Sequence, residues 1–274
     1  MNAKTYYMVL ADGSRWSIQA GDEQALAVVS RLREVMQLSG GQGPSSRLLV
    51  RVDGRGGVLD RCGDEVVCVL PEAKDDDGLY VQLMQLSMVV AREAQTRGGV
   101  LLHGGLAEWK GHGVVLAAPG GTGKTTASGR LPSPWRSLCD DMTLVVRDAQ
   151  GHYWAHPWPT WSCFLWGGSG GSWDVEDAVP LKGIFFLSRA DEDRVERVGS
   201  GQGVSLLVEC AQQASQLMTR GLSKEEKRAL QLERFNNLCA LTRTIPSHLL
   251  HISLTGTFWL EMERMLLGRK GVVP

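Results

Sequence analysis

The chain has 274 residues, enough for one large domain or two small ones. Hydrophobic residues make up 43% and charged residues 22% of the sequence, as is typical of a globular protein with a sizeable core. The formal net charge of −1 excludes the broad positive field of a nucleic-acid-binding protein. No apolar run is long enough to span a bilayer, and the first residues lack the apolar core of a secretory signal. We therefore expect a cytoplasmic protein that binds neither nucleic acid nor membrane.

Cysteines and histidines are the residues that can form disulfides or bind a soft metal. The cysteines are Cys62, Cys68, Cys139, Cys163, Cys210 and Cys239. No two of them form a Cys-x-x-Cys pair, which favours reduced thiols over a zinc site. The pairs His152/His156 and His248/His251 have the spacing of metal ligands on a helix, but they fall in segments predicted as strand or loop. We expect structural or surface roles for them.

Residues 1–98 predict a small α/β unit, because alternating apolar segments and helically spaced apolar segments follow one another. In chain order, the expected elements are a hairpin over 5–19, a helix over 23–38, a loop over 40–46, strands over 48–52 and 65–70, an acidic turn over 75–78 and a long helix over 79–96. The pair Gly98-Gly99 ends this unit.

Residues 99–274 predict a larger α/β unit. Its expected elements are strands over 100–103 and 106–109 joined through two glycines, a strand over 114–118, a helix over 125–130, strands over 138–146 and 181–188, a charged edge over 191–197, helices over 204–230 and 232–242 with a break near 221–223, a strand over 247–254 and a helix over 257–267. Residues 156–161 contain too many prolines for a central strand. The glycine-rich stretch 166–173 favours a surface linker over a substrate lid.

Residues 114–126 have the order of a phosphate-binding loop: an apolar strand, a glycine-rich turn, and Lys-Thr-Thr at the start of a helix. In such a loop, backbone N–H groups and the helix N-terminus face a polyphosphate. Lys124 would contact the terminal phosphates and Thr125 would hold Mg²⁺. The residues assigned to nucleotide binding are Ala118, Pro119, Gly120, Gly121, Thr122, Gly123, Lys124, Thr125 and Thr126. Ala118 stands where the motif usually has glycine, and the alternative is a plain glycine-rich turn before an amphipathic helix.

Two adjacent acids, Asp140 and Asp141, lie in the strand predicted after the loop. Because neighbouring strand residues point to opposite faces, one carboxylate can face an attacking hydroxyl while the other faces a metal. The alternative is a solvated Asp-Asp turn. His103 ends an apolar run before the loop, and by itself it would be a structural histidine.

Three motifs together resemble the core of the bacterial HPr kinase/phosphorylase family: His103-Gly104, the glycine loop with Lys124-Thr125, and Cys139-Asp140-Asp141. That family has a His-Gly pair, a Gly-x-x-Gly-x-Gly-Lys-Ser loop and an Ala-Asp-Asp strand at similar spacing. The resemblance is confined to about residues 100–147. The short chain and the tail with Phe258-Trp259-Leu260 look more like divergent members found in peptide-modification gene clusters, such as the SynChlorMet cassette protein ScmC and kinases acting on lasso-peptide precursors.

The resemblance implies a fold like the nucleotide domain of phosphoenolpyruvate carboxykinase, with a mixed, curved sheet and flanking helices. It implies an ATP- and Mg²⁺-dependent kinase that phosphorylates a serine-type hydroxyl on a peptide or protein partner. Lys124 and the loop would bind the phosphates of ATP. Thr125 and Asp141 would hold Mg²⁺. Asp140 would be the base that takes the hydroxyl proton, and His103 would support Asp140 electrostatically.

One part of the family pattern is missing. The family has a downstream Glu-Ile-Arg-Gly signature that is linked to metal binding and to dephosphorylation. Here the comparable residues 157–162 read Pro-Trp-Pro-Thr-Trp-Ser, without an acid. This loss predicts a kinase without phosphorylase activity. Asp174 and Glu176 follow later in the chain and are candidates to replace the missing acid.

Other functions stay open at this level: a nucleotide-binding scaffold or sensor without transfer activity, a kinase of a small hydroxylated metabolite, and an NTPase with water as acceptor. The tryptophans of this region can line a substrate cleft or pack in the core, and core packing is the simpler interpretation. They are Trp154, Trp158, Trp161, Trp166 and Trp173. The acceptor, the base specificity and the oligomeric state, with a homo-oligomer among the options, have no readable determinant.

Overall fold

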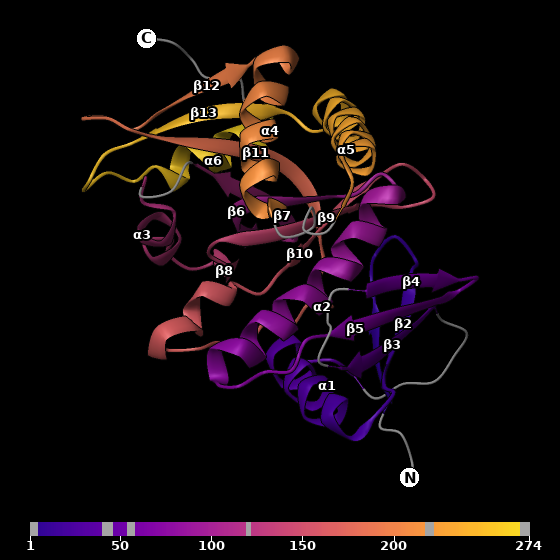
Figure 1. Cartoon of the computed structure of the whole chain (residues 1–274). Helices are drawn as coiled ribbons and strands as arrows, with labels where there is room; N and C mark the ends of the chain where they lie inside the picture. The colour runs from indigo at the N-terminus through magenta and orange to yellow at the C-terminus, as the bar shows by residue number, and fades with distance from the viewer. Residues whose placement is uncertain (1–4, 40–45, 54–57, 119–121, 217–221, 269–274) are drawn as a thin grey trace.

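The computed structural model describes residues 5–39, 46–53, 58–118, 122–216 and 222–268 (Figure 1). The strands are β1 (Thr5–Val9), β2 (Arg15–Ala20), β3 (Ser46–Val52), β4 (Val58–Cys62), β5 (Glu65–Leu70), β6 (Val100–Trp109), β7 (His112–Ala117), β8 (Arg136–Cys139), β9 (Met142–Arg147), β10 (Tyr153–Pro157), β11 (Val179–Arg189), β12 (Arg194–Val198) and β13 (Ser247–Ile252). The helices are α1 (Glu23–Met36), α2 (Asp76–Thr96), α3 (Lys124–Gly129), α4 (Ser200–Ala214), α5 (Lys224–Thr244) and α6 (Trp259–Leu266), with short 3₁₀ turns η1 (Trp161–Cys163) and η2 (Leu165–Gly167). The predicted α/β class with mixed sheets is confirmed.

The first sheet has five strands in the order β1-β2-β3-β5-β4. Its outer pairs are antiparallel and its inner pairs are parallel. Asp22 joins sheet and helix, because one carboxylate oxygen accepts from Ala25 N–H to cap α1 and the other accepts from Val52 N–H at the end of β3. The predicted hairpin, helix and two strands are confirmed. Strand β4 was not expected, because Asp60 and Arg61 interrupt its apolar pattern at an exposed edge.

The second sheet has eight strands, in the order β10-β9-β6-β7-β11-β13-β12 with β8 paired to β6. Strands β7, β11 and β13 run parallel, and the other pairs are antiparallel. Strand β10 pairs with β9 and also with the start of β11. The sheet must therefore curl, since β10 meets two strands that lie far apart in the order.

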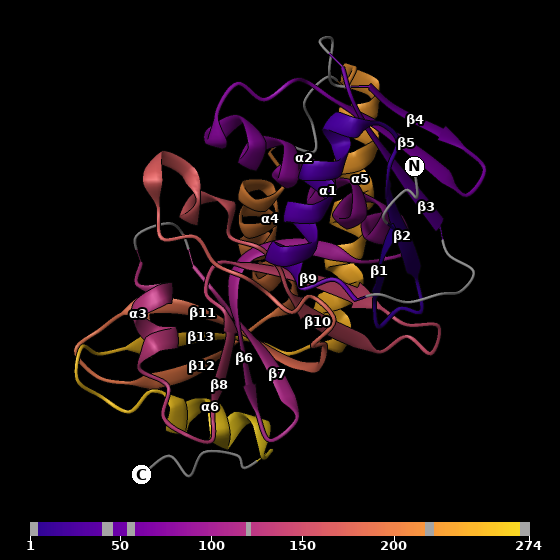
Figure 2. The same ribbon diagram turned by 90° about the horizontal axis from the view of Figure 1, so that it is seen from below.

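Helices cover both faces of the parallel strands (Figure 2). Residues of β7 alternate between the faces, as strand geometry requires. Val115 and Ala117 pack in the core that includes Leu207 of α4. Val114 and Leu116 pack in a second core with α3 and α6. The alternation places α3 and the loop before it at the end of a strand that is buried on both sides.

Helix α2 lies between the two sheets (Figure 1). Leu83, Leu86 and Val90 are buried in one apolar core that also contains Trp16 of the first sheet and Leu102 of the second. The residues 75–78 are the start of this helix and not a separate turn, because the Asp75 carboxylate accepts from Gly78 N–H at 2.8 Å and caps it. The division into 1–98 and 99–274 stays a prediction. In the described part of the chain, no helix is long and apolar enough to cross a membrane.

The strands predicted over 100–103 and 106–109 are one continuous strand, β6. Gly104 and Gly105 do not turn the chain; they let neighbouring strands come close. A Cβ atom on Gly104 would lie 2.9 Å from a Val115 methyl carbon, and one on Gly105 would lie 3.0 Å from Asp140 O. Both distances are shorter than normal contacts, so the strand needs glycine at these positions.

Two further expectations were wrong. The strand predicted over 138–146 is two strands, β8 and β9, and the Asp140-Asp141 pair forms the bend between them. The helices expected to separate near residue 231 form one helix, α5, which begins at the capping box of Ser223 and Glu226. The prediction that residues 156–161 form no central strand agrees with the structure: Pro157 is the last residue of β10, where a missing N–H disturbs the ladder least, and residues 158–161 belong to no strand.

His156 fastens β10 to the first sheet. Its side chain is fully buried, Nε2 accepts from Ala11 N–H at 3.1 Å, and Nδ1–H donates to Val175 O at 2.7 Å. Both bonds require the neutral ring with its proton on Nδ1. Burial lowers the pKa of His156 below its ordinary value. His152, by contrast, is exposed and faces Asp148. The structural and surface roles predicted for this pair agree with these positions.

Replacing Gly104 with Ala is expected to lower the free energy of unfolding by about 1–3 kcal/mol, because the added methyl overpacks the contact with Val115. The matched control is Gly201→Ala on α4, where a Cβ would meet nothing within 4 Å. There the substitution should be neutral or stabilise by up to about 1 kcal/mol. Urea unfolding of both variants measures the difference. Equal effects at the two positions would show that β6 does not need glycine.

Stability should fall as the pH drops below about 6.5, because the unfolded chain then protonates His156 while the native state keeps it neutral. The contribution of His156 to stability is complete above the pKa that this residue has in the unfolded chain. It is lost as the pH falls toward the lower pKa that His156 has in the native state. Urea unfolding at about pH 7.5 and about pH 5.5 measures it. His156→Gln should show a smaller loss than the wild type, whereas His152→Gln should keep the wild-type loss. An unchanged pH dependence in His156→Gln would contradict this role.

Candidate active site

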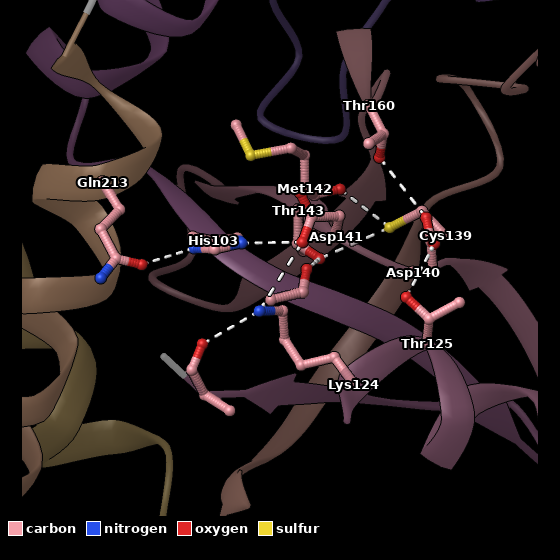
Figure 3. A network of polar contacts seen from close by, with 12 residues as sticks. His103, Lys124, Thr125, Cys139, Asp140, Asp141, Met142, Thr143, Thr160 and Gln213 are labelled. Carbon is pink, nitrogen blue, oxygen red and sulfur yellow. Dashed lines mark hydrogen bonds and ion pairs between the residues drawn. The ribbon is translucent and has the colours of Figure 1, made fainter. Parts of the chain in front are cut away.

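The residues that the sequence singles out come together at the C-terminal end of β7, next to His103 within β6 (Figure 3). Lys124 begins α3, directly after the loop that follows β7. Its side chain is 6% exposed, and its ammonium donates to Ala118 O at 3.0 Å. The same nitrogen lies 3.6 Å from an Asp141 carboxylate oxygen. A buried ammonium group needs such oxygen partners, because burial without them would cost several kcal/mol.

The loop itself is described at its two ends. Residues 119–121, which include Pro119, Gly120 and Gly121, lie outside the described part of the chain. Gly123 has φ of 106°, a conformation that favours glycine. Ala118 is not among the described non-glycine residues with positive φ, so it replaces the usual glycine without backbone strain. Thr122 accepts a hydrogen bond from Arg189 through its carbonyl oxygen.

His103 lies between two oxygen acceptors. Its Nε2 lies 2.7 Å from Asp141 Oδ1, and its Nδ1 lies 2.5 Å from the side-chain oxygen of Gln213 on α4. Both nitrogens can donate only when the ring is an imidazolium. Hydrogen bonding to Asp141 accordingly raises the pKa of His103, against the opposing effect of burial. The resemblance implied that His103 supports Asp140; the structure pairs it with Asp141 instead.

Asp141 lies between two cationic groups. Burial alone would raise its pKa, but the hydrogen bond from His103 and the charges of His103 and Lys124 outweigh burial, and the pKa lies below its usual value. Gly104 N–H donates to the Asp141 backbone oxygen at 2.8 Å, which fixes the bend against β6. Asp141 is therefore ionised at neutral pH and held in place from both its backbone and its side chain.

Asp140 contacts two hydroxyl groups rather than cations. Thr125 Oγ1 donates to one carboxylate oxygen at 3.3 Å, and Thr160 Oγ1 donates to the other at 3.4 Å. Hydroxyl and carboxylate oxygens are the ligands that Mg²⁺ prefers, so Thr125 and Asp140 fit a magnesium site. No group of three His, Cys, Asp or Glu residues suited to a metal occurs among the described residues. The rest of a magnesium shell would have to be phosphate and water.

Two site residues were missed by the sequence reasoning. Thr160 lies in the segment where the family's acid is missing, and a search for hydroxyls there would have found it. Gln213 belongs to no motif and is brought in only by the packing of α4 against β6. The proposed replacements for the acid lie elsewhere: Glu176 accepts from Val9 N–H, and Asp174 caps its own turn.

Two cavities border the site. The larger, about 490 Å³, is bordered by His103 and Asp141. The smaller, about 390 Å³, lies beside Thr122, Gly123 and Thr126. Most of the tryptophans expected in the core are there: Trp158, Trp161 and Trp173 are at most 8% exposed, while Trp166 is 85% exposed. Trp161 serves both interpretations, since it also lines the larger cavity.

All six cysteines are free, and none belongs to a group of metal-binding residues within the described part of the chain. Cys139 precedes the acidic pair and is buried between β6 and β9, where its thiol donates to Met142 O. Burial raises the pKa of Cys139 to about 11. The thiol is therefore protonated and acts as a packing group that supports the bend.

The fold and site together define a mixed α/β protein in which a glycine-loop lysine, a paired aspartate bend and a half-buried histidine lie together. Comparison with protein families adds a specific assignment. The model of the SynChlorMet cassette protein ScmC family matches residues 66–267. The chain belongs to this family. No curated protein matches it.

Proposed function

We propose that this protein is an ATP- and Mg²⁺-dependent kinase that phosphorylates a serine-type hydroxyl of a peptide or protein, without phosphorylase activity. One observation carries the proposal: the lysine of a glycine loop and two aspartates lie within a few ångströms of one another, although they are distant in sequence. Lys124 Nζ lies 3.6 Å from Asp141, and the Thr125 hydroxyl lies 3.3 Å from Asp140. Phosphoryl transfer needs this combination of a phosphate-binding cation, metal-ligating oxygens and an acceptor-side carboxylate.

The proposal extends to the fold. We infer that the eight-stranded sheet with its flanking helices is a nucleotide-binding core similar to that of phosphoenolpyruvate carboxykinase. Its support is the mixed strand order, the curl that brings β10 to β11, and the position of the glycine loop directly after β7. The six-residue length of α3 also fits, since the loop needs only the first turn of the helix.

In this proposal one aspartate binds the metal and the other accepts the proton. The resemblance assigned the base to Asp140 and the metal to Asp141, but the contacts favour the reverse. Asp141 borders the larger cavity, where an acceptor can enter, and Asp140 faces the Thr125 hydroxyl. Mg²⁺ held by Thr125 and Asp140 would neutralise charge on the phosphates of ATP. Asp141 is ionised and held by His103, ready to accept a proton.

The transfer step follows from these positions. The acceptor hydroxyl oxygen forms a bond to the γ-phosphorus, the bond from that phosphorus to the bridging oxygen breaks, and ADP leaves. The hydroxyl proton passes to Asp141. A carboxylate with a low pKa is sufficient, because the proton moves late in a loose transition state. His103 then faces a neutral acid, and its positive charge favours return of the proton to solvent.

The smaller cavity suits the nucleoside end of ATP. With the γ-phosphate toward Asp141, the rest of the nucleotide extends past Thr122 and Thr126, which border this cavity. Arg130 closes its far side by donating to Ser253 O and Gly256 O. Ile252 and Leu254 supply apolar surface for a base.

The test is incubation of the full chain with γ-labelled ATP, Mg²⁺ and the peptides encoded beside its gene, followed by mass spectrometry. We expect one added phosphate on a serine. Lys124→Ala should abolish nucleotide binding, measured by calorimetry, because the phosphates lose their buried cation. Lys182→Ala, an exposed lysine on β11, is the matched control and should bind normally. Nucleotide binding that survives in Lys124→Ala would contradict the assignment of the loop.

Replacing each aspartate with Asn separates their roles. Asp141→Asn should keep nucleotide binding and lower kcat by about 10²–10⁴-fold at every Mg²⁺ concentration, since the proton acceptor is gone. Asp140→Asn should instead need more Mg²⁺, and high Mg²⁺ should restore part of the rate. Steady-state kinetics over a Mg²⁺ titration measures both. The opposite pattern would return the base to Asp140, as the resemblance implied.

A nucleotide-binding scaffold is the second candidate. It is favoured by one observation: both Asp140 oxygens are engaged by hydroxyl groups, and no third acidic residue joins them among the described residues. A scaffold would bind ATP through Lys124 and transfer label to no peptide, metabolite or water. Full recovery of unhydrolysed ATP in the incubation above would identify it.

A further inference from the structure

The larger cavity is more spacious than an acceptor hydroxyl requires. Its volume of about 490 Å³ lies in the range of pockets that enclose a whole small ligand, about 300–1,000 Å³. It is formed by five parts of the chain: α2, β6, the bend at the start of β9, the segment after β10, and the end of α4. A serine side chain would fill only the part next to Asp141.

Four apolar side chains form a wall of the cavity, and Thr160, Ser162 and Gln213 line it beside them. Met84 and Met88 project from α2, and Met142 and Trp161 complete the surface. Trp161 is 5% exposed, and its indole N–H donates to Ser87 Oγ at 2.9 Å, which fixes the ring. Methionine side chains are flexible and polarisable, so they adapt to apolar groups of different shapes. The wall therefore combines one rigid aromatic surface with three adaptable side chains.

The charged residues that line the cavity also favour an apolar ligand. The described residues that line it include Asp141 but no Lys or Arg. His103 also lines the cavity, but its ring and the Lys124 ammonium both already face Asp141. An acidic side chain in the cavity would lose water beside the Asp141 carboxylate, and it would have to compete with Asp141 for the groups that already pair with it, which is costly. An apolar side chain would gain by leaving water.

We propose that this cavity binds the residue next to the acceptor serine and selects an apolar side chain there. This inference rests on the proposed kinase function, because it takes Asp141 as the acceptor-side carboxylate. The acceptor hydroxyl lies at Asp141, and the neighbouring side chain packs between Met84, Met88 and Trp161. The substrate is thus a peptide segment in which an apolar residue adjoins serine, and an acidic neighbour is excluded.

The test uses three synthetic peptides that differ only at the residues flanking one central serine: leucine, alanine or aspartate in an otherwise alanine-glycine background. Calorimetry with the full chain and a non-hydrolysable ATP analogue measures binding without needing transfer. We expect the leucine peptide to bind about tenfold or more tightly than the alanine peptide, as apolar pockets discriminate. The aspartate peptide should bind most weakly.

Two variants locate the effect. Met84→Gln keeps the length of the side chain but adds an amide, and it should reduce the preference for leucine over alanine to about threefold or less. Met265→Gln is the matched control. Met265 is also a partly buried methionine on a helix, but it lies on α6 and packs against the second core, away from the residues that line the cavity. Its preference should be unchanged. Ser162→Lys adds a cation at an exposed position that lines the cavity, and it should improve binding of the aspartate peptide.

Equal binding of the three peptides would overturn the proposal. It would also be overturned if Met84→Gln kept the full preference for leucine and Ser162→Lys did not improve binding of the aspartate peptide. Incubating the same peptides with γ-labelled ATP tests the cavity proposal and the proposed kinase function separately. A preference for the leucine peptide without labelled serine would support the cavity assignment and contradict the kinase function. Labelled serine without any preference supports the kinase and removes the cavity assignment.

Discussion

The close approach of β6 to the chain on either side of it determines the geometry of the site. Gly104 and Gly105 leave no room for side chains, with Val115 on one side and Asp140 O on the other. Gly104 also donates to Asp141 O, and its carbonyl accepts from Thr143 at 2.8 Å. These contacts place the bend of Asp140 and Asp141 against His103, which precedes Gly104 on β6. A larger residue at either glycine would move the aspartates away from the lysine.

The charges of the site compensate one another. Lys124 is buried, His103 is half-buried with a pKa raised by its hydrogen bond to Asp141, and Asp141 is the carboxylate that both face. Removing one member of such a group leaves an unpaired buried charge, which costs more than the intact group gains. Asp140 stands apart from this group, and its hydrogen-bond partners among the described residues are the hydroxyl groups of Thr125 and Thr160. Because the surroundings differ, two adjacent and identical residues acquire different chemistry, and the sequence shows only that they are adjacent.

Periodicity and motif order made much of the fold predictable. Helix α1, the first hairpin and β11 follow from apolar spacing, and the glycine loop followed by Lys124 places α3 after β7. The failures have local causes. Gly104 and Gly105 were interpreted as a turn because glycine more often breaks a strand, and their close contacts appear only once β7 is in place. The acidic pair was assigned to a strand because Leu138 to Val146 is apolar around it.

The partners of the site residues could not be predicted in the same way. The pairing of His103 with Asp141 depends on the direction of the bend, which alternation along one strand does not describe. Gln213 reaches the site from a helix that begins far downstream, and Met84 reaches it from one far upstream. Such contacts come from tertiary packing, since the residues involved share no motif.

The position of α2 bears on how the protein can be divided. The family match begins within β5 and includes α2, although the expected boundary falls after the helix, at 98/99. Excision of residues 1–98 would keep His103 and Lys124 but would remove Met84 and Met88, and it would strip the cover from the apolar face beneath them. Helix α2 therefore packs as part of the unit that contains the candidate site, and a minimal fragment has to retain it.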